Sequence, residues 1–325
     1  MNKPGDKNSN GQQLLRITDA KGTDFNARVW VLKCRNCDAV YGCNSSDAWE
    51  RKCPKCQSGR AGLAIPIERD GEKWNREEHI IAFNLYNQLP FGRFHARHPR
   101  VKELGALLGR KPGSASRKLT NFARLDPALQ ARGIVASQHG SHGEEIIWDE
   151  FTDKPELLAF ESERLLANRL GQSIEEVAEI DVGDLPPEGR EREAIVRLRV
   201  NQSFFRSRIL SAYNFRCCVT GLAAKPLLVA SHIIPWSEDR ANRLNPRNGL
   251  CLNALHDRAF DRRLMWVDGS LRIRFANKLH ESAKVGNSSL EWLLGFEGGA
   301  LKLPKKFSPD AELLFRHAER CKAAQ

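Results

Sequence analysis

Four cysteines form two pairs whose spacing suits a metal ion. Cys34 and Cys37 make one Cys-x2-Cys pair, and Cys53 and Cys56 make another after fifteen intervening residues. Two facing turns of this kind supply the four thiolates of a tetrahedral zinc site. Because four cysteines leave no open coordination position, we expect a structural zinc ion that stabilises a small ribbon domain. The alternatives are buried thiol pairs or a redox dithiol, which would require a βαβ context that this region lacks.

A second group of residues suits the hydrolysis of a phosphodiester. His232 ends the apolar run VASH, Asn248 precedes the short run GLCL, and His256 follows that run. A neutral imidazole can take a proton from water near pH 7, and a divalent cation can stabilise charge on a phosphate. Each residue also has a plainer interpretation, as a structural histidine, a turn asparagine or a helix-capping histidine. The order and context of the three together favour a nuclease.

The segment SHIIPW followed by NGLCLNALHDRAFD resembles the HNH endonuclease family, and the resemblance covers roughly residues 193–320. It implies a ββα-metal finger in which His232 is the general base, Asn248 positions the loop or the base, and His256 is a ligand of the catalytic metal. Asp261 is a further expected metal ligand, with a salt bridge to an arginine as its alternative role. Mg²⁺ or Mn²⁺ suits oxygen ligands, whereas a transition metal would suit His256 better.

Two residues depart from the pattern of the HNH family. Many relatives carry Asp or His immediately before the base, where this chain has Ser231, and a second histidine where this chain has Phe260. These departures support an alternative function, a DNA-binding regulator or adaptor whose finger has lost catalysis. An RNA-directed nuclease is a weaker alternative.

The segment 76–125 predicts three helices, at 76–89, 101–109 and 113–125, followed by a β-hairpin from 133–136 and 144–151. The last two helices have the proportions of a helix-turn-helix, and the segment loosely resembles winged-helix DNA-binding domains. Leu119 and Phe122 are expected to face inward. The expected DNA contacts are Arg110, Lys111, Ser114, Ser116, Arg117 and Lys118. An ordinary helical bundle with a solvated basic face is the alternative.

A basic helix is predicted at about 191–213, directly before the proposed nuclease region. The residues on it that could hold DNA phosphates are Arg197, Arg199, Arg206 and Arg208. The alternative is a solvated amphipathic helix whose apolar face packs on the nuclease module.

These patterns predict an α+β protein of several domains, with strands at 26–33 and 63–67 inside the ribbon. The expected domains are a flexible tail (1–24), a zinc ribbon (25–70), a winged-helix-like helical module (71–152), a helical linker (153–192), and an HNH nuclease with a C-terminal helical extension (193–325). The expected activity is metal-dependent hydrolysis of DNA in a restriction or other defence role.

Composition supports a polyanionic partner. The 325 residues carry a formal net charge of +11, which suits double-stranded DNA. No apolar run reaches the length of a membrane span, and the N-terminal residues lack the apolar core of a signal peptide, so a cytoplasmic protein without a membrane partner is expected. A homodimer that cuts both strands and a monomeric nickase are equally consistent with the sequence.

Overall fold

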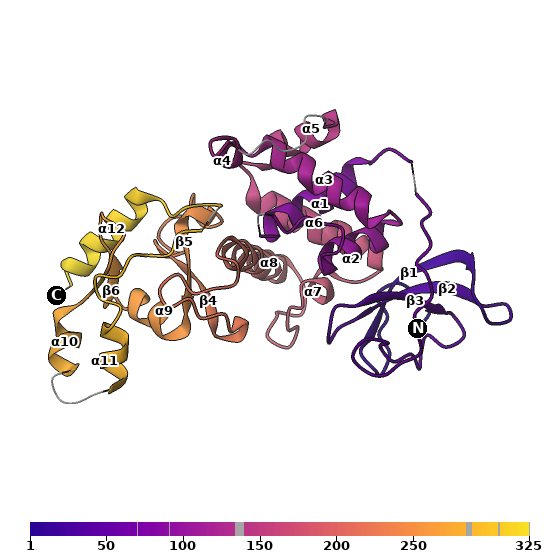
Figure 1. The fold of residues 1–325 in the computed structure, drawn as a ribbon, viewed down its shortest axis with the longest axis horizontal. Helices are drawn as coiled ribbons and strands as arrows, with labels where there is room; N and C mark the ends of the chain where they lie inside the picture. Colours follow the sequence, from indigo (N-terminus) through magenta and orange to yellow (C-terminus); the bar gives the residue numbers. More distant parts are fainter. Residues whose placement is uncertain (70, 91, 134–139, 284–287, 305, 325) are drawn as a thin grey trace. The chain divides into compact units, whose positions relative to one another are not determined.

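The computed structural model describes residues 1–69, 71–90, 92–133, 140–283, 288–304 and 306–324. These residues form two compact units, each coloured by position along the chain in Figure 1. The first unit comprises Met1–Asn87 and Gly92–Val200, and the second comprises Gln88–Phe91 and Asn201–Gln325. Both units combine helices with small antiparallel sheets, so the expected α+β class is confirmed.

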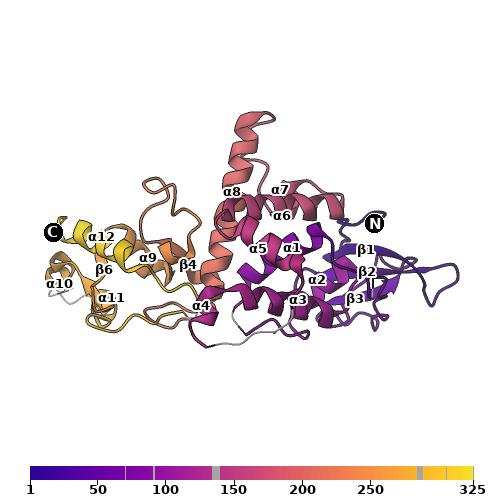
Figure 2. The same cartoon turned by 90° about the horizontal axis from the view of Figure 1, so that it is seen from above.

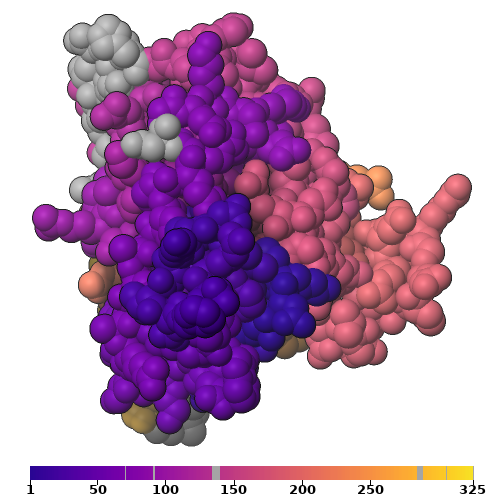
Figure 3. Space-filling view, turned by 90° about the vertical axis from the view of Figure 1, so that its right-hand side faces the viewer, coloured from indigo at the N-terminus to yellow at the C-terminus, as the bar shows by residue number. Residues whose placement is uncertain are grey.

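The first unit opens with an antiparallel sheet of β1 (Gln12–Lys21), β2 (Arg28–Cys34) and β3 (Val40–Asn44), in that order. Figure 3 views the protein from the side of this sheet, which is indigo. The predicted strand at 26–33 is confirmed as β2. The prediction of a loose tail over 1–24 is wrong, because β1 pairs with β2 and Leu14 is fully buried.

The strand predicted at 63–67 does not form. Only Leu63 pairs, through an isolated bridge to Gly42. Pro66 has no backbone N–H to donate to a neighbouring strand, so a proline near the end of this segment works against continued pairing.

Seven helices are described in the rest of the first unit. They are α1 (Arg76–Gln88), α2 (Pro99–Leu108), α3 (Pro112–Leu125), α4 (Pro127–Gln130), α5 (His142–Phe151), α6 (Pro155–Leu170) and α7 (Ile174–Val177). The first three confirm the predicted helices. Gly109 ends α2 in the left-handed region, with φ of 68°, which glycine adopts without steric cost. Leu119 and Phe122 of α3 are fully buried, as expected.

Helix α5 replaces the second strand of the predicted hairpin. Ser141 and Glu144 form a capping box that starts the helix, and Ile147 and Phe151 bury one helical face at i, i+4 spacing. The prediction of a strand at 144–151 is therefore wrong. The buried apolar residues follow the 3.6-residue period of a helix and not the two-residue period of a strand. The first predicted strand, 133–136, falls mostly outside the described residues.

Two cations predicted to contact DNA are instead buried in the first unit. Arg110 is 2% exposed and forms an ion pair with Glu78, at 2.8 Å between Nη2 and Oε2. Lys118 is 7% exposed and forms an ion pair with Glu144, whose pKa is raised by burial but lowered further by Lys118 and Asn121. A phosphate cannot reach either cation, so the prediction of DNA contact is wrong for both.

The second unit contains most of the region predicted to be the nuclease. Figure 2 shows α8 (Arg190–Ala212), the predicted basic helix, which begins in the first unit and ends in the second. It is followed by η1 (Lys225–Leu227), β4 (Leu228–His232), η2 (Pro246–Asn248), β5 (Gly249–Asn253), α9 (Ala254–Asp261), β6 (Met265–Val267), β7 (Ile273–Phe275), α10 (Asn277–Ala283), α11 (Ser288–Leu294) and α12 (Ala311–Lys322). Phe260 of α9 is buried and stacks on His317 of α12, with ring centroids 3.7 Å apart. Every helix in the described ranges is too short or too polar to span a bilayer.

Replacing Lys118 with Met is expected to destabilise the first unit by about 3 kcal/mol, because it leaves the Glu144 carboxylate buried without its cation. Lys118 Nζ lies 5.1 Å from the centre of the Trp74 ring, so tryptophan fluorescence during urea denaturation would follow the change. The neighbouring Arg117→Met is the control, since Arg117 is exposed. Equal stability of the two variants would show that the buried ion pair does not stabilise the fold.

Candidate active site and metal centre

The four predicted zinc ligands meet in the first unit. Their sulfur atoms all lie within 4.8 Å of one another. The Cys34–Cys56 and Cys37–Cys53 sulfur pairs are each 3.6 Å apart. Four sulfurs around zinc, at a Zn–S distance of about 2.3 Å, would be separated by about 3.8 Å, so the donor set fits a tetrahedral zinc ion.

The environment of the cysteines favours a thiolate at the cluster. Burial raises the pKa of the Cys34 thiol, but the backbone N–H groups of Cys37 and Asn36 outweigh burial and bring the pKa to about 7. Cys43 lies outside the cluster, and burial raises the pKa of its thiol to about 12. Cys43 is therefore a buried, protonated core residue and not an alternative ligand.

The second candidate site is a strand–strand–helix finger in the second unit. Strands β4 and β5 pair antiparallel, with His232 opposite Gly249, and α9 follows β5 directly. The connecting loop returns through η2, so the end of β4 and the start of β5 lie together. At Gly249 an added Cβ would meet the side chain of Ile209 at 2.3 Å and that of Phe205 at 2.9 Å, so the close approach of α8 requires glycine there.

His232 is held by two contacts at the end of β4. Its ring stacks on Phe205, with centroids 3.8 Å apart and planes 9° apart. Its Nε2 atom lies 2.9 Å from the backbone oxygen of Arg243. A carbonyl only accepts hydrogen bonds, so Nε2 carries the proton and donates it, and the neutral ring keeps Nδ1 as its proton acceptor.

Burial and nearby charge act oppositely on the pKa of His232. Burial lowers this pKa, whereas the hydrogen bond to Arg243 and the negative charge of Asp261 raise it. Burial prevails, and the pKa lies below the usual value. His232 is therefore neutral at physiological pH, the form that can accept a proton.

Asn248 fixes the loop that orients His232. It is fully buried; its Oδ1 accepts from Ile234 N at 2.9 Å, and its Nδ2 donates to the oxygens of Ile234 and Asn242, at 3.1 Å each. Asn242 directly precedes Arg243, whose carbonyl accepts from the His232 ring. These bonds account for the predicted bracing of the loop by Asn248.

His256 is fully buried beside aromatic rings. Its Nδ1 lies 3.0 Å from Asn253 Oδ1, and its ring contacts Trp292 and Phe296 at centroid distances of 5.6 and 5.3 Å. Burial lowers the pKa of His256 to about 4. Its Nε2 atom is buried without a hydrogen-bond partner among the described residues, so one ring nitrogen is left that could bind a metal ion. The role of His256 as a catalytic metal ligand stays a prediction. On α9 the face that carries His256 and Phe260 packs into the core, and Asn253 caps the helix at the His256 N–H.

The neighbouring face of α9 carries two carboxylates. Asp257 and Asp261 are separated by one helical turn. Asp261 raises the pKa of Asp257, and His232 lowers the pKa of Asp261. Burial raises the pKa of Asp261, and the positive charges of Arg258, His232 and Arg262 oppose it. The structure thus brings the predicted ligand Asp261 near His232.

Asp257 lies beside Ser231 on β4. Burial raises the pKa of Asp257, the Ser231 hydroxyl lowers it, and Asp261 raises it again. No hydrogen bond of standard geometry forms from the buried Ser231 hydroxyl. The i, i+4 spacing of Asp257 and Asp261 in the sequence could have indicated that both carboxylates lie on one side of a helix. The contact of His232 with the Arg243 carbonyl could not be predicted in this way, because every residue has a backbone carbonyl.

The carboxylate oxygens of Asp257 and Asp261 are the donors that Mg²⁺ and Mn²⁺ prefer. The negative charge of Asp261 raises the pKa of Asp257, and a divalent cation would relieve this repulsion. These two residues fit a catalytic cation. Within the described residues, however, the cysteine cluster alone meets the test of three or more potential ligand atoms near one another.

The arginines predicted on α8 have different surroundings. Arg208 is 8% exposed and donates to the Leu244 oxygen at 3.2 Å, so its predicted DNA contact is wrong. Arg206 donates to the Leu228 oxygen at 2.8 Å but remains exposed. Arg197 is exposed and lies over the Phe160 ring at 3.9 Å.

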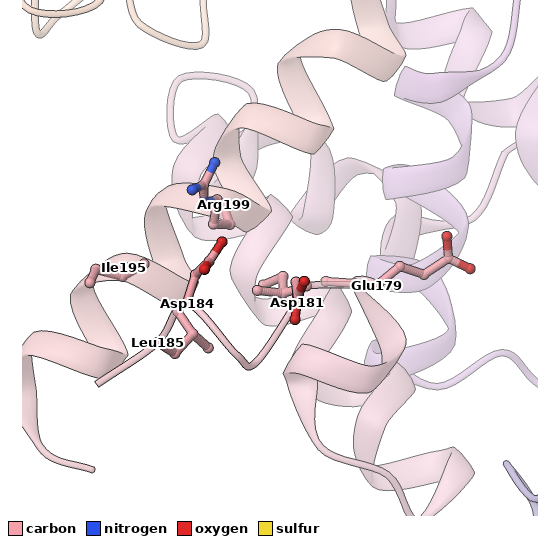
Figure 4. A pocket seen from close by; sticks show the side chains of 8 residues that line it. Glu179, Asp181, Asp184, Leu185, Ile195 and Arg199 are labelled. Carbon is pink, nitrogen blue, oxygen red and sulfur yellow. The ribbon is translucent and has the colours of Figure 1, made fainter. Parts of the chain in front are cut away.

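Arg199 lines a cavity of about 340 Å³ beside the start of α8. Figure 4 shows Asp184 and Asp181 at the same cavity, with the Glu179 side chain directed away. Carboxylates at this opening repel a phosphate, so the cavity argues against Arg199 as a DNA contact.

The remaining predicted DNA contacts lie at the start of α3. Lys111 and Arg117 are exposed, and Ser116 is partly exposed. The Ser114 hydroxyl accepts from Trp74 Nε1 at 3.3 Å. The structure therefore leaves these four residues at the surface or near it, unlike Arg110 and Lys118.

Residues 217–268, which include this finger, match the family model described as HNH endonuclease. The match falls on the segment whose motif resembled that family, and it supports the predicted resemblance. A comparison with the curated proteins gives no match.

Replacing Cys34 with Ser is expected to remove bound zinc and lower the unfolding temperature of the first unit, because the ribbon depends on all four thiolates. Zinc per chain can be measured by atomic emission, and unfolding by calorimetry. Cys43→Ser is the control, since Cys43 is buried but outside the cluster. Full zinc content in Cys34→Ser, or equal zinc loss in both variants, would contradict the assignment.

Proposed function

We propose that this chain is a metal-dependent endonuclease that hydrolyses phosphodiester bonds of double-stranded DNA, in a restriction or other defence role. The observation that carries the proposal is the orientation of His232. Its Nε2 donates to the Arg243 oxygen at 2.9 Å, which leaves Nδ1 as a proton acceptor, and Asp261 is close enough for its charge to raise the pKa of the ring. The match of residues 217–268 to the HNH endonuclease family supports a nuclease.

The chain's own residues account for the parts of the reaction. His232 Nδ1 takes a proton from the attacking water as the oxygen of that water bonds to phosphorus, and the 3′ oxygen leaves. Asn248 holds the loop that orients the ring, and Phe205 fixes the plane of the ring by stacking. A divalent cation held by Asp257 and Asp261 would supply the positive charge that stabilises the phosphate in the transition state.

A second candidate is a DNA-binding regulator whose finger has lost catalysis. Ser231 stands where many relatives carry a carboxylate or histidine, and Phe260 stands where many carry a second histidine. Phe260 is buried against His317 and offers no ligand atom. DNA binding without cleavage in Mg²⁺, Mn²⁺ or Ni²⁺ would favour this regulator.

His232→Ala is expected to reduce plasmid cleavage by about 10²- to 10⁴-fold, the usual contribution of a general base. In the wild type, cleavage is expected to fall on the acid side with an apparent pKa below about 6.5, because burial favours neutral His232. Rates across pH 5 to 8 with saturating Mn²⁺ would measure both effects. His142→Ala, on an exposed side chain, is the control. An unchanged rate in His232→Ala would exclude this residue as the base.

Asp261→Asn is expected to raise the metal concentration for half-maximal cleavage by about 10- to 100-fold, the range produced even by loss of groups that support a ligand. His256→Gln is the matched comparison. It should lower the unfolding temperature, because His256 is buried, without changing the metal requirement. The reverse pattern, with a metal effect in His256→Gln only, would restore His256 as the ligand.

A further inference from the structure

The loop between α1 and α2 carries an unusual excess of positive charge. Residues 92–102, which comprise the end of this loop and the first turn of α2 and are called the loop below, contain four Lys or Arg and two His, and no Asp or Glu. The cations are Arg93, Arg97, Arg100 and Lys102, and the histidines are His95 and His98. This loop precedes the pair of helices predicted to be a helix-turn-helix, yet its sequence was not assigned to DNA binding.

The backbone of the loop is held in place. Phe94 is 7% exposed and packs against Tyr86, with ring centroids 5.3 Å apart. His98 N donates to the His95 oxygen at 2.9 Å, and α2 begins at the next residue, Pro99. An anchored loop loses little conformational entropy when its side chains bind a partner.

The charges on this loop fall into two groups. Arg93, His95, Arg97 and Lys102 are exposed, and no ion pair is found for them in the described part of the chain. Arg100, in contrast, is partly buried and feels the negative charges of Glu103, Glu163 and Asp38. Arg100 therefore belongs to the packing of the unit, and the four exposed side chains face solvent.

The charges around His98 confirm that cations gather here. Burial lowers the pKa of His98, and the positive charges of His95, Arg100 and Arg93 lower it further. No carboxylate contributes to this environment. Clustered cations repel one another, and a polyanion would relieve that repulsion.

We propose that the exposed cations of this loop, Arg93, His95, Arg97 and Lys102, bind the phosphate backbone of double-stranded DNA. The loop leads into the N-terminus of the ten-residue helix α2, whose dipole also favours negative charge. Arg110 and Lys118, two cations predicted to contact DNA, are buried in ion pairs, whereas the cations of this loop are exposed to solvent. Contacts of this kind position the protein on DNA and carry no sequence information.

The proposal rests on DNA as the substrate of the proposed nuclease, and its test uses binding without cleavage. The full-length His232→Ala protein would be titrated against a fluorescent 30-base-pair duplex by anisotropy at several salt concentrations. Adding Arg93→Gln and Arg97→Gln is expected to weaken binding by at least about 5-fold. It should also reduce the slope of log K against log salt by about 1.8, which is the loss of two phosphate contacts at about 0.9 each.

The control adds Lys154→Gln and Arg190→Gln to the same His232→Ala protein. Both residues are exposed in the first unit and lie outside the loop, so the variant loses the same net charge. It should keep the parent affinity within about 2-fold and its salt slope within about 0.5. Zinc content and unfolding temperature confirm that both proteins are folded.

Absence of duplex binding by the parent, unchanged affinity in the loop variant, or equal loss in loop and control variants would overturn the proposal. A loop variant that binds single-stranded RNA less well but duplex DNA as before would do the same, since the partner would then be RNA. A failed nuclease would be recognised separately, because wild-type protein would bind the duplex through this loop and leave it uncut.

Discussion

The hydrogen bond from His232 Nε2 to the Arg243 carbonyl is the interaction on which the active site depends. It selects one tautomer, and so decides which ring nitrogen can accept a proton. The bond exists only because Asn248 ties Ile234 and Asn242 together across the loop. Packing completes the constraint, since Phe205 reaches the ring only where Gly249 leaves room for α8.

The two faces of α9 have different surroundings, since one packs in the core and the other carries carboxylates. His256 and Phe260 bury one face, among aromatic rings and against α12. Asp257 and Asp261 occupy the other face, beside β4.

Because some cations are buried in ion pairs, the positions of Lys and Arg in the sequence do not by themselves show where the protein surface is positive. Arg110 and Lys118 each neutralise a fully buried glutamate, Glu78 and Glu144, so these cations specify how the helices pack. The α1–α2 loop, in contrast, carries exposed cations, Phe94 anchors its chain, and no acidic residue intervenes in its sequence. In the ribbon, by comparison, four thiolates take the place of a large apolar core.

The sequence by itself determined the features that follow from local spacing. The two Cys-x2-Cys pairs predicted the cysteine cluster, helical periodicity predicted α1 to α3, and the order of His232, Asn248 and the following helix indicated the HNH finger. The tertiary structure decided which side chains meet. It buried His256, placed Asp261 close enough to His232 for their charges to interact, made a helix of 142–151, and buried Arg110 and Lys118. The reason is physical: residue type and spacing fix local geometry, whereas the direction of a side chain depends on contacts between segments distant in sequence.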